Sequence, residues 1–315
     1  MEAMYADKSN GLHWPYVFSL PGWMSTWWDF FGAGFYLSLI AVRDGDRIVG
    51  IAPFKLKDST ASFIGDDSVC DYLDFIVVPG KESVFSEILI GECVARGISR
   101  LDLSTLRPDS VAWQYLLPMA RKQALEVECR EADVSYEMPL PDSFDAYLKQ
   151  LTSKQRHELL RKQRNLEMEA GASFSLLQDS EVTEKEMDMF LSLMAGSRKD
   201  KAEFLTANMK NFFKGIGRAL AAYSVLRLGF LKIGTRPVAV VLGFDYNNYV
   251  YLYNSGYNPD YNDLSVGLIS KTAFIRWSIE HQKSTFDFLK GLEVYKERLG
   301  GKQVNLSACS FSLEN

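Results

Sequence analysis

Residues 237–256, PVAVVLGFDYNNYVYLYNSG, hold two apolar runs on either side of the turn-forming stretch Asp-Tyr-Asn-Asn. Runs so rich in β-branched and aromatic residues predict two strands, at 237–245 and 249–256. We expect a strand at 224–233 before them, then a helix at about 265–281 and a strand at 285–289. This order predicts an α/β (α+β) domain with a mixed, mostly antiparallel sheet flanked by helices.

The first half of the chain repeats this order of elements. Strand-like runs at 36–42 and 47–56 flank Arg43-Asp44-Gly45-Asp46, and an Asp-Gly between such runs is a strong hairpin signal. Further elements are expected as strands at 61–64, 73–78 and 100–104 and as a helix at about 82–96 that ends near Gly97. The repeat predicts two related domains in tandem, at 1–140 and 141–315.

A helical block is expected between the two sheets. Pro139-Leu140-Pro141 marks a break, and a first helix is predicted at 143–151. A second helix begins at Thr152, because Thr152 and Gln155 have the spacing of a capping box, and Gly171 is expected to close it. Two more helices, at 183–194 and 201–220, complete the block.

Composition excludes several classes of protein. The 315 residues carry a net charge of -5, with 47% hydrophobic and 24% charged residues, which excludes disordered and fibrous chains. The pI near 5.4 argues against a general nucleic-acid binder. No apolar run approaches the roughly 18 residues of a transmembrane helix, and residues 1–20 lack a secretory pattern, so we expect a cytoplasmic protein.

Cysteine and histidine usage narrows the chemistry further. Cys70, Cys93, Cys129 and Cys309 are far apart in the sequence, with no CxxC pair and no histidine at metal-ligand spacing. No GxSxG or HExxH signature is present. We therefore expect neither a metal site nor a hydrolase of the familiar nucleophilic or zinc types.

The polar segment 254–267 lies between an expected strand and an expected helix. With Ser265 or Asp263 as N-cap and Gly267 in the first turn, the free backbone N–H groups and the helix dipole could hold a pyrophosphate or a carboxylate. The alternative is a capped helix that simply follows a loop.

Two charged features require a role. Asp287 lies in an otherwise apolar strand, so its carboxylate needs a partner such as Lys290, Tyr295 or Lys296, or a task in catalysis. Segment 154–164 has five basic residues and one acid, and it could bind an anion, a tRNA acceptor stem or an anionic membrane through Arg161 and Arg164. The alternative is a solvated helix face with leucines packed inward.

The chain resembles the CelD-like, FemAB-related branch of the GNAT acyltransferase superfamily. The resemblance is most specific in Asp-Phe-Leu-Lys-Gly-x-Glu-x-Tyr-Lys, within residues 286–301. It extends to residues 252–257 and 151–167, to Ser197 followed by Lys-Ala-Glu-Phe-Leu at 201–205, and to Pro-Gly-Trp at 21–23 with Gly-Ile-Ala-Pro-Phe at 50–54. The usual phosphate loop, Arg/Gln-x-x-Gly-x-Gly/Ala, is absent, and only Gly267 remains beside Asp263.

The resemblance implies two GNAT folds in tandem. The first domain would be degenerate, and acceptor binding is one role left open for it. The second domain would contain the active site. It implies acyl-CoA (acetyl-CoA) as cosubstrate, bound along the strand at 249–256 and at the following helix. The residues near this donor would be Tyr253, Asn254, Leu264, Ser265, Val266, Gly267 and Lys271. The catalytic residues would be Asp287, Glu293, Tyr295 and Lys296, and Arg161, Arg164 and Tyr257 would bind an anion or the substrate.

The mechanism implied is direct attack of an amine or hydroxyl on the donor carbonyl, with strand N–H groups stabilising the oxyanion. Asp287 or Glu293 would accept the proton, and Tyr295 would protonate the leaving thiolate. The acceptor class implied is a cell-envelope or exopolysaccharide precursor. Two alternatives stay open: FemAB-type transfer from aminoacyl-tRNA, and a non-catalytic binding module.

Overall fold

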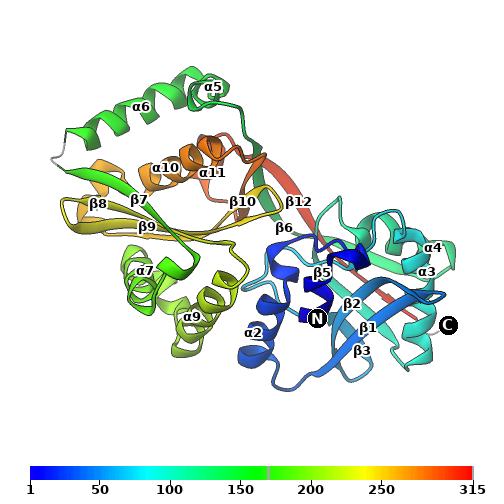
Figure 1. Cartoon of the computed structure of the whole chain (residues 1–315). Coiled ribbons are helices and arrows are strands. Elements are labelled where there is room, and N and C mark those ends of the chain that lie inside the picture. Colours follow the sequence, from blue (N-terminus) through cyan, green and yellow to red (C-terminus); the bar gives the residue numbers. More distant parts are fainter. Residues whose placement is uncertain (169–170, 314–315) are drawn as a thin grey trace. The chain divides into compact units, whose positions relative to one another are not determined.

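The computed structural model describes residues 1–168 and 171–313, which form two compact units (Figure 1). Unit 1 consists of Met1–Val134 together with the last strand from Val304 on, and unit 2 is Ser135–Gln303. The expected boundaries, 1–140 and 141–315, differ from this division at the C-terminus. The reason is that β12 (Lys302–Ser312) pairs antiparallel with β5 (Arg100–Leu106) and so returns the chain to unit 1.

Unit 1 contains the predicted hairpin, in which β1 (Tyr36–Asp44) pairs with β2 (Arg47–Lys57). Gly45 at the turn has φ of 62°, a conformation that suits glycine. The strand order is β1-β2-β3-β5-β12-β6, with β3 at Thr60–Phe63 and β6 at Val127–Pro139. Of the strand expected at 73–78, only β4 (Ile76–Val77) forms, and it pairs with β2.

Helices cover the sheet of unit 1. They are α1 (Glu2–Ala6), α2 (Pro21–Phe31), α3 (Glu82–Ala95) and α4 (Leu117–Lys122). The prediction at 82–96 is thus confirmed within one residue, and Gly97 follows with φ of 72°. A disulfide joins Cys129 on β6 to Cys309 on β12, two residues 180 positions apart in the chain. The sequence spacing of the cysteines gave no sign of this pair.

Unit 2 contains the elements predicted at 224–289. Its strand order is β6-β11-β10-β9-β8-β7, and only the β10–β11 pair is parallel. The strands after β6 are β7 (Ala172–Gln178), β8 (Leu226–Ile233), β9 (Arg236–Tyr246), β10 (Tyr249–Tyr257) and β11 (Thr285–Lys290). The predicted fold class, a mixed and mostly antiparallel sheet flanked by helices, is confirmed.

Helices pack on both faces of this sheet (Figure 1). On one face lie α5 (Phe144–Gln150), α6 (Ser153–Glu167) and α10 (Val266–Glu280), and on the other lie α7 (Glu184–Ser197) and α9 (Ala207–Ala221). The capping box at Thr152 is confirmed, since its hydroxyl accepts the Gln155 N–H. Helix α6 ends at Glu167, before the expected Gly171, and the intervening residues 169–170 lie outside the described part of the chain.

The helix expected at 201–220 is two helices. The first, α8, covers Lys199–Phe204, and α9 begins at Ala207 with Thr206 as its cap. The Thr206 hydroxyl accepts the Met209 N–H at 3.2 Å and so starts a new helix where a continuous one was expected. Lys201 therefore lies in a short helix of its own, from which its side chain reaches β10.

Candidate functional site

Strand β10 is irregular in its middle. Its register with β9 shifts between Leu252 and Asn254, so Tyr253 is the extra residue of a β-bulge. The Tyr253 ring packs against Phe213 and Phe244, with centroids 5.8 and 5.2 Å apart. The parallel ladder to β11 covers only Tyr249–Tyr251 among the described pairs. The described ladder between β10 and β11 therefore ends just before the bulge.

Two neighbouring elements hold the β10 segment that follows the bulge in place. The Lys201 Nζ donates hydrogen bonds to the Asn254 Oδ1 at 2.9 Å and to the Ser255 carbonyl oxygen at 2.6 Å. At Gly256, a Cβ atom would lie 2.3 Å from the Met194 backbone nitrogen, so α7 packs on β10 as closely as only glycine allows. The conformation of residues 254–256 is therefore set by α7 and α8.

Lys271 projects from α10 into the same region. Its side chain is 7% exposed, and its Nζ donates to the Gly267 carbonyl oxygen at 2.9 Å and lies 4.7 Å from the centre of the Tyr295 ring. The pKa of Lys271 is lowered to about 7, and burial is the largest cause. The positive charges of Lys201 and Lys296 act in the same direction, and the negative charge of Glu293 acts against them. A buried amine that loses its proton near neutral pH can act as a base.

Lys201 has a related environment. Burial lowers its pKa to about 8, the charge of Arg198 acts in the same direction, and Glu293 and Asp200 oppose the shift. Arg198 itself forms a two-point ion pair with Asp200, at 2.9 and 2.6 Å. The pKa values of buried Lys271 and half-buried Lys201 are thus both lowered, and the positive charge of Lys201 contributes to the shift at Lys271.

Helix α11 (Val294–Arg298) supplies the third lysine, and Glu293, the residue before it, supplies an acid. The Lys296 side chain is 1% exposed, and its Nζ donates to the carbonyl oxygens of Leu289, at 2.9 Å, and Lys290. It also pairs with the Glu293 carboxylate at 2.9 Å, and the Glu293 side chain is 42% exposed. We call Lys201, Lys271, Lys296 and Glu293 the lysine cluster. Glu293 connects the buried amines to solvent.

Asp287 is fully buried and has a structural partner. Its Oδ1 accepts the Leu289 N–H at 2.8 Å, and Leu289 has φ of 61°, which is rare for a leucine. The register of β11 with β6 shifts at this point, between Asp287 and Leu289. The Asp287 carboxylate therefore holds the backbone of a second bulge, next to the carbonyl groups that Lys296 binds.

Two tyrosines border the lysine cluster. Burial raises the pKa of Tyr295 far above its ordinary value, and the charge of Glu293 adds to the shift, so the phenol keeps its proton. The Tyr257 ring lies against the first turn of α10, since a Cβ at Gly267 would be 3.0 Å from it. The Tyr295 ring thus lies next to the Lys271 amine, and the Tyr257 ring lies next to the start of α10.

The start of α10 differs from the expected cap. Ser265 is the N-cap residue, as predicted, but it has φ of 54° and its side chain makes no capping bond. Its carbonyl oxygen accepts the N–H groups of Leu268 and Ile269. The preceding 3-10 segment, Pro259–Leu264, carries Asp260 and Asp263, both exposed. An anion at this helix end would approach two carboxylates.

The structure brings most predicted site residues into one region of unit 2. These are Asp287, Glu293, Tyr295, Lys296, Tyr253, Asn254, Tyr257, Gly267 and Lys271, together with Leu264, Ser265 and Val266 at the start of α10. Arg161 and Arg164 instead lie exposed on α6. Lys201 and Arg198 were missing from the predicted site, although the basic stretch Arg-Lys-Asp-Lys at 198–201 was a usable signal.

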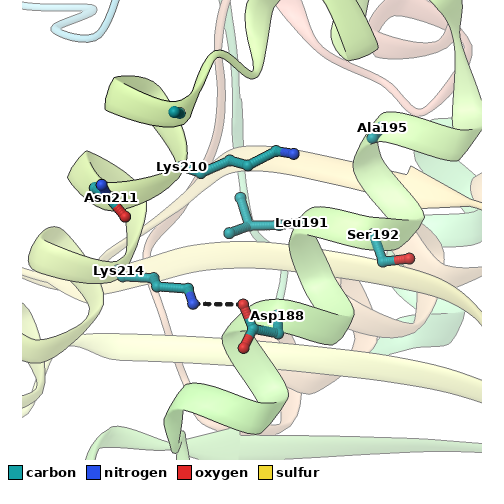
Figure 2. Close-up of a pocket in the computed structure, with 8 residues that line it drawn as sticks. Asp188, Leu191, Ser192, Ala195, Lys210, Asn211 and Lys214 are labelled. Atoms are coloured by element: carbon teal, nitrogen blue, oxygen red, sulfur yellow. Dashed lines mark ion pairs between the residues drawn. The ribbon is translucent and has the colours of Figure 1, made fainter.

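A separate groove lies between α7 and α9, with a volume of about 490 Å³ (Figure 2). Figure 2 shows Lys214 reaching from α9 to Asp188 on α7, and the ion pair measures 2.6 Å. None of the described residues that line this groove belongs to the predicted site.

Over the part of the chain that the structure describes, no group of three or more His, Cys, Asp or Glu side chains could hold a metal, and no helix has the length and apolar character to cross a membrane.

Comparison with known proteins agrees with this fold and places the candidate site within a known domain type. Residues 153–297 match the family model of the acetyltransferase (GNAT) domain, so unit 2 carries a GNAT domain. The crystal structure of FemX superposes with a TM-score of 0.68 at 12% identity, covering 98% of this chain and 95% of that chain. A conserved protein of unknown function from Bacteroides thetaiotaomicron VPI-5482 gives 0.61 at 11% identity, covering 92% and 89%.

No curated protein matches the chain in sequence. The family match identifies residues 153–297 as a GNAT domain, as the sequence motifs predicted. The fold of the whole chain is similar to that of FemX.

Proposed function

We propose that unit 2 transfers an acyl group from an acyl-CoA to an amine or hydroxyl of a cell-envelope or exopolysaccharide precursor in the cytoplasm. The observation that carries the proposal is the lysine cluster beside the β10 segment that follows the bulge, within a GNAT domain. The acceptor class rests on the resemblance to the FemAB-related branch. The following steps derive what each residue does.

The edge of β10 beyond Tyr251 binds and orients the donor. The described ladder to β11 ends at Tyr251, and the amides of a pantetheine arm would add to β10 past this point as a further strand does. Backbone N–H groups of the same edge stabilise the charge that develops on the carbonyl oxygen during attack. The acceptor attacks this carbonyl directly, without a covalent enzyme intermediate.

Lys271 takes the proton that the acceptor loses. Its lowered pKa, about 7, leaves a useful fraction of neutral amine at physiological pH, and a catalytic pKa close to the working pH is optimal for general base catalysis. Glu293, half-exposed, relays the proton to solvent. Tyr295, whose raised pKa keeps the proton on the phenol, donates a hydrogen bond that stabilises the leaving thiolate. Asp287 and Lys296 hold the β11 backbone around these groups.

Thermal unfolding with a panel of acyl-CoAs tests the donor. A ligand at about 100 times its Kd should add roughly 2.7 kcal/mol to the free energy of unfolding. We expect one acyl-CoA to stabilise the protein and Lys271→Met to keep this binding while thiol release falls at least tenfold. Stabilisation by no acyl-CoA would contradict the proposed donor. A folded Lys271→Met protein that keeps its full cellular role would favour the non-catalytic alternative.

A second donor, aminoacyl-tRNA, is favoured by one specific observation. Asp260 and Asp263 lie in the segment that leads into α10, where a CoA pyrophosphate would be held, and like charges repel there. An aminoacyl ester needs no pyrophosphate site. This donor predicts tRNA binding that weakens steeply with salt, whereas CoA binding changes much less.

A further inference from the structure

Two large aliphatic side chains are exposed next to the lysine cluster. Leu292 is 73% exposed and Val294 is 59% exposed, and they flank Glu293 in the connection from β11 to α11 (Val294–Arg298). Each of these side chains loses the free energy of burial, and exposed aliphatic groups that lie together mark interaction surfaces. We call Leu292 and Val294 the aliphatic pair.

A positive helix lies beside this loop. Helix α6 has five basic and two acidic residues, a net charge of +3 in a chain whose net charge is -5. Its exposed residues include Lys154, His157, Arg161 and Arg164, which recur at steps of three or four and so form one stripe. We call these four residues the basic stripe.

The helix and the loop are joined by a direct contact. The Gln155 Nε2, at the start of α6, donates to the Glu297 carbonyl oxygen of α11 at 3.1 Å. Thr152 fixes the same Gln155 side chain through the capping box. The start of the basic stripe is thus tied to the helix that follows the aliphatic pair, and both features belong to unit 2.

We infer that the basic stripe and the aliphatic pair dock unit 2 on an anionic membrane surface. Basic residues draw a protein to anionic headgroups, and exposed aliphatic side chains enter the boundary between headgroups and acyl chains. The phosphate backbone of a nucleic acid could bind the basic stripe, but it has no apolar surface against which Leu292 and Val294 could pack. The aliphatic pair therefore favours a lipid surface over RNA.

Docking at this surface places the lysine cluster next to the membrane, because Glu293 lies between the two members of the aliphatic pair. The acceptor would then be a precursor carried on a lipid. This last step rests on the proposed function, whereas docking itself is independent of catalysis and is tested without it.

Co-sedimentation with vesicles tests the inference. The probes are vesicles of phosphatidylcholine alone and vesicles with about one third phosphatidylglycerol. We expect binding to the second kind only, weakened by salt. Arg161→Gln with Arg164→Gln should weaken it about 25-fold, since each basic residue near such a surface contributes about fivefold. Leu292→Ser with Val294→Ser should weaken it at least roughly tenfold.

Matched controls remove the same groups elsewhere. Lys185→Gln with Lys210→Gln deletes two exposed lysines from α7 and α9, on the other face of the sheet. Val94→Ser removes a valine of unit 1 that is 53% exposed. Both control proteins should bind vesicles as the wild type does, and circular dichroism should show that every variant is folded.

Three results would overturn the inference. One is an absence of binding to anionic vesicles; another is equal weakening by the control variants. The third is salt-dependent tRNA binding that the Arg161/Arg164 variant loses while vesicles bind neither protein, which would assign the basic stripe to RNA. Vesicle binding with no acyl transfer to any acceptor would leave the docking surface established and refute only the proposed function.

Discussion

The Lys201 ammonium group donates a hydrogen bond to the Ser255 carbonyl oxygen, 2.6 Å away, and a second one to the Asn254 side chain. The same Asn254 oxygen accepts the Ser255 N–H at 2.9 Å. One side chain from α8 therefore fixes both residues that follow the β10 bulge. The segment expected to bind the donor is held by a helix about fifty residues earlier in the chain.

Lys201→Met should abolish donor binding while changing the free energy of unfolding only slightly. The substitution removes two hydrogen bonds but also a buried charge, whose cost is evident in the lowered pKa of Lys201, about 8. We expect the free energy of unfolding at pH 7 to change by about 1 kcal/mol or less. Stabilisation by the donor should be lost because residues 254 and 255 loosen. Urea unfolding with and without donor measures both.

The control for this variant is Lys199→Met, in the same short helix, where the side chain is 91% exposed. It should leave both quantities unchanged. Full donor-induced stabilisation of the Lys201→Met protein would show that β10 keeps its shape without the lysine.

Stability should rise with pH just above neutrality. The pKa of Lys271 is about 7 in the folded protein and 10.5 in the unfolded chain, so between these values the unfolded state binds more protons. The free energy of unfolding then increases with pH, by at most about 1.4 kcal/mol per pH unit for one lysine. Lys201 adds to this from about pH 8.

The useful window is pH 7 to 8.5. Above it, Cys70 and Cys93, whose pKa values burial raises to about 12, begin to oppose the trend as the unfolded thiols ionise near their ordinary value of 9.0. Urea unfolding at several pH values should show a smaller slope for Lys271→Met than for the wild type. The exposed-lysine variant Lys185→Met should keep the wild-type slope; equal slopes in all three proteins would refute the assignment.

Asp287 should show a difference between its two simplest variants. Asp287→Ala leaves the buried Leu289 N–H without this acceptor, at a cost of about 1–3 kcal/mol. Asp287→Asn keeps an oxygen in the same place and should cost less. Urea unfolding measures the free energy of unfolding of both variants. If the alanine variant is as stable as the asparagine variant, the Asp287 carboxylate does not stabilise the bulge.

Gly256 should tolerate no side chain. A Cβ there would lie 2.3 Å from the Met194 nitrogen, and backbone cannot yield as a flexible side chain does. Gly256→Ala should destabilise the protein by about 1–3 kcal/mol or more. Gly196→Ala in α7, with nothing within 4 Å of the new methyl group, should instead stabilise by about 0.5–1 kcal/mol. Thermal unfolding compares the two, and equal effects would contradict the close packing of α7 on β10.

The Cys129–Cys309 disulfide should stabilise unit 1. It joins two strands far apart in the chain, and removing such a link costs about 2–5 kcal/mol. Reductant or Cys129→Ser should lower the Tm by the same amount, and reductant should have no effect on the variant. An unchanged Tm under reducing conditions would show that the strand pairing alone holds β12.

Several features were predictable because their signals are local. The hairpin at 36–57 followed from Asp-Gly between two apolar runs, the start of α6 from Thr152 and Gln155, and the strands at 224–256 from their composition. The DFLKG stretch and its neighbours predicted the GNAT domain that the family model matches. Each of these signals depends on residues a few positions apart, where backbone conformation and hydrogen bonding are decided.

Other features needed the folded chain. The sequence placed residues 304–312 in the second domain, but their strand partner, β5, lies two hundred residues away. Lys201 was absent from the predicted site because nothing in its own segment shows that it meets Ser255.

The sequence by itself determined the kinds of elements, their order and the presence of a GNAT domain. The tertiary structure decided which charges share one buried space. A lysine loses its proton near pH 7 only when distant parts of the chain exclude water from it and bring other cations close, and Lys271 owes this to α8, α10 and α11 together.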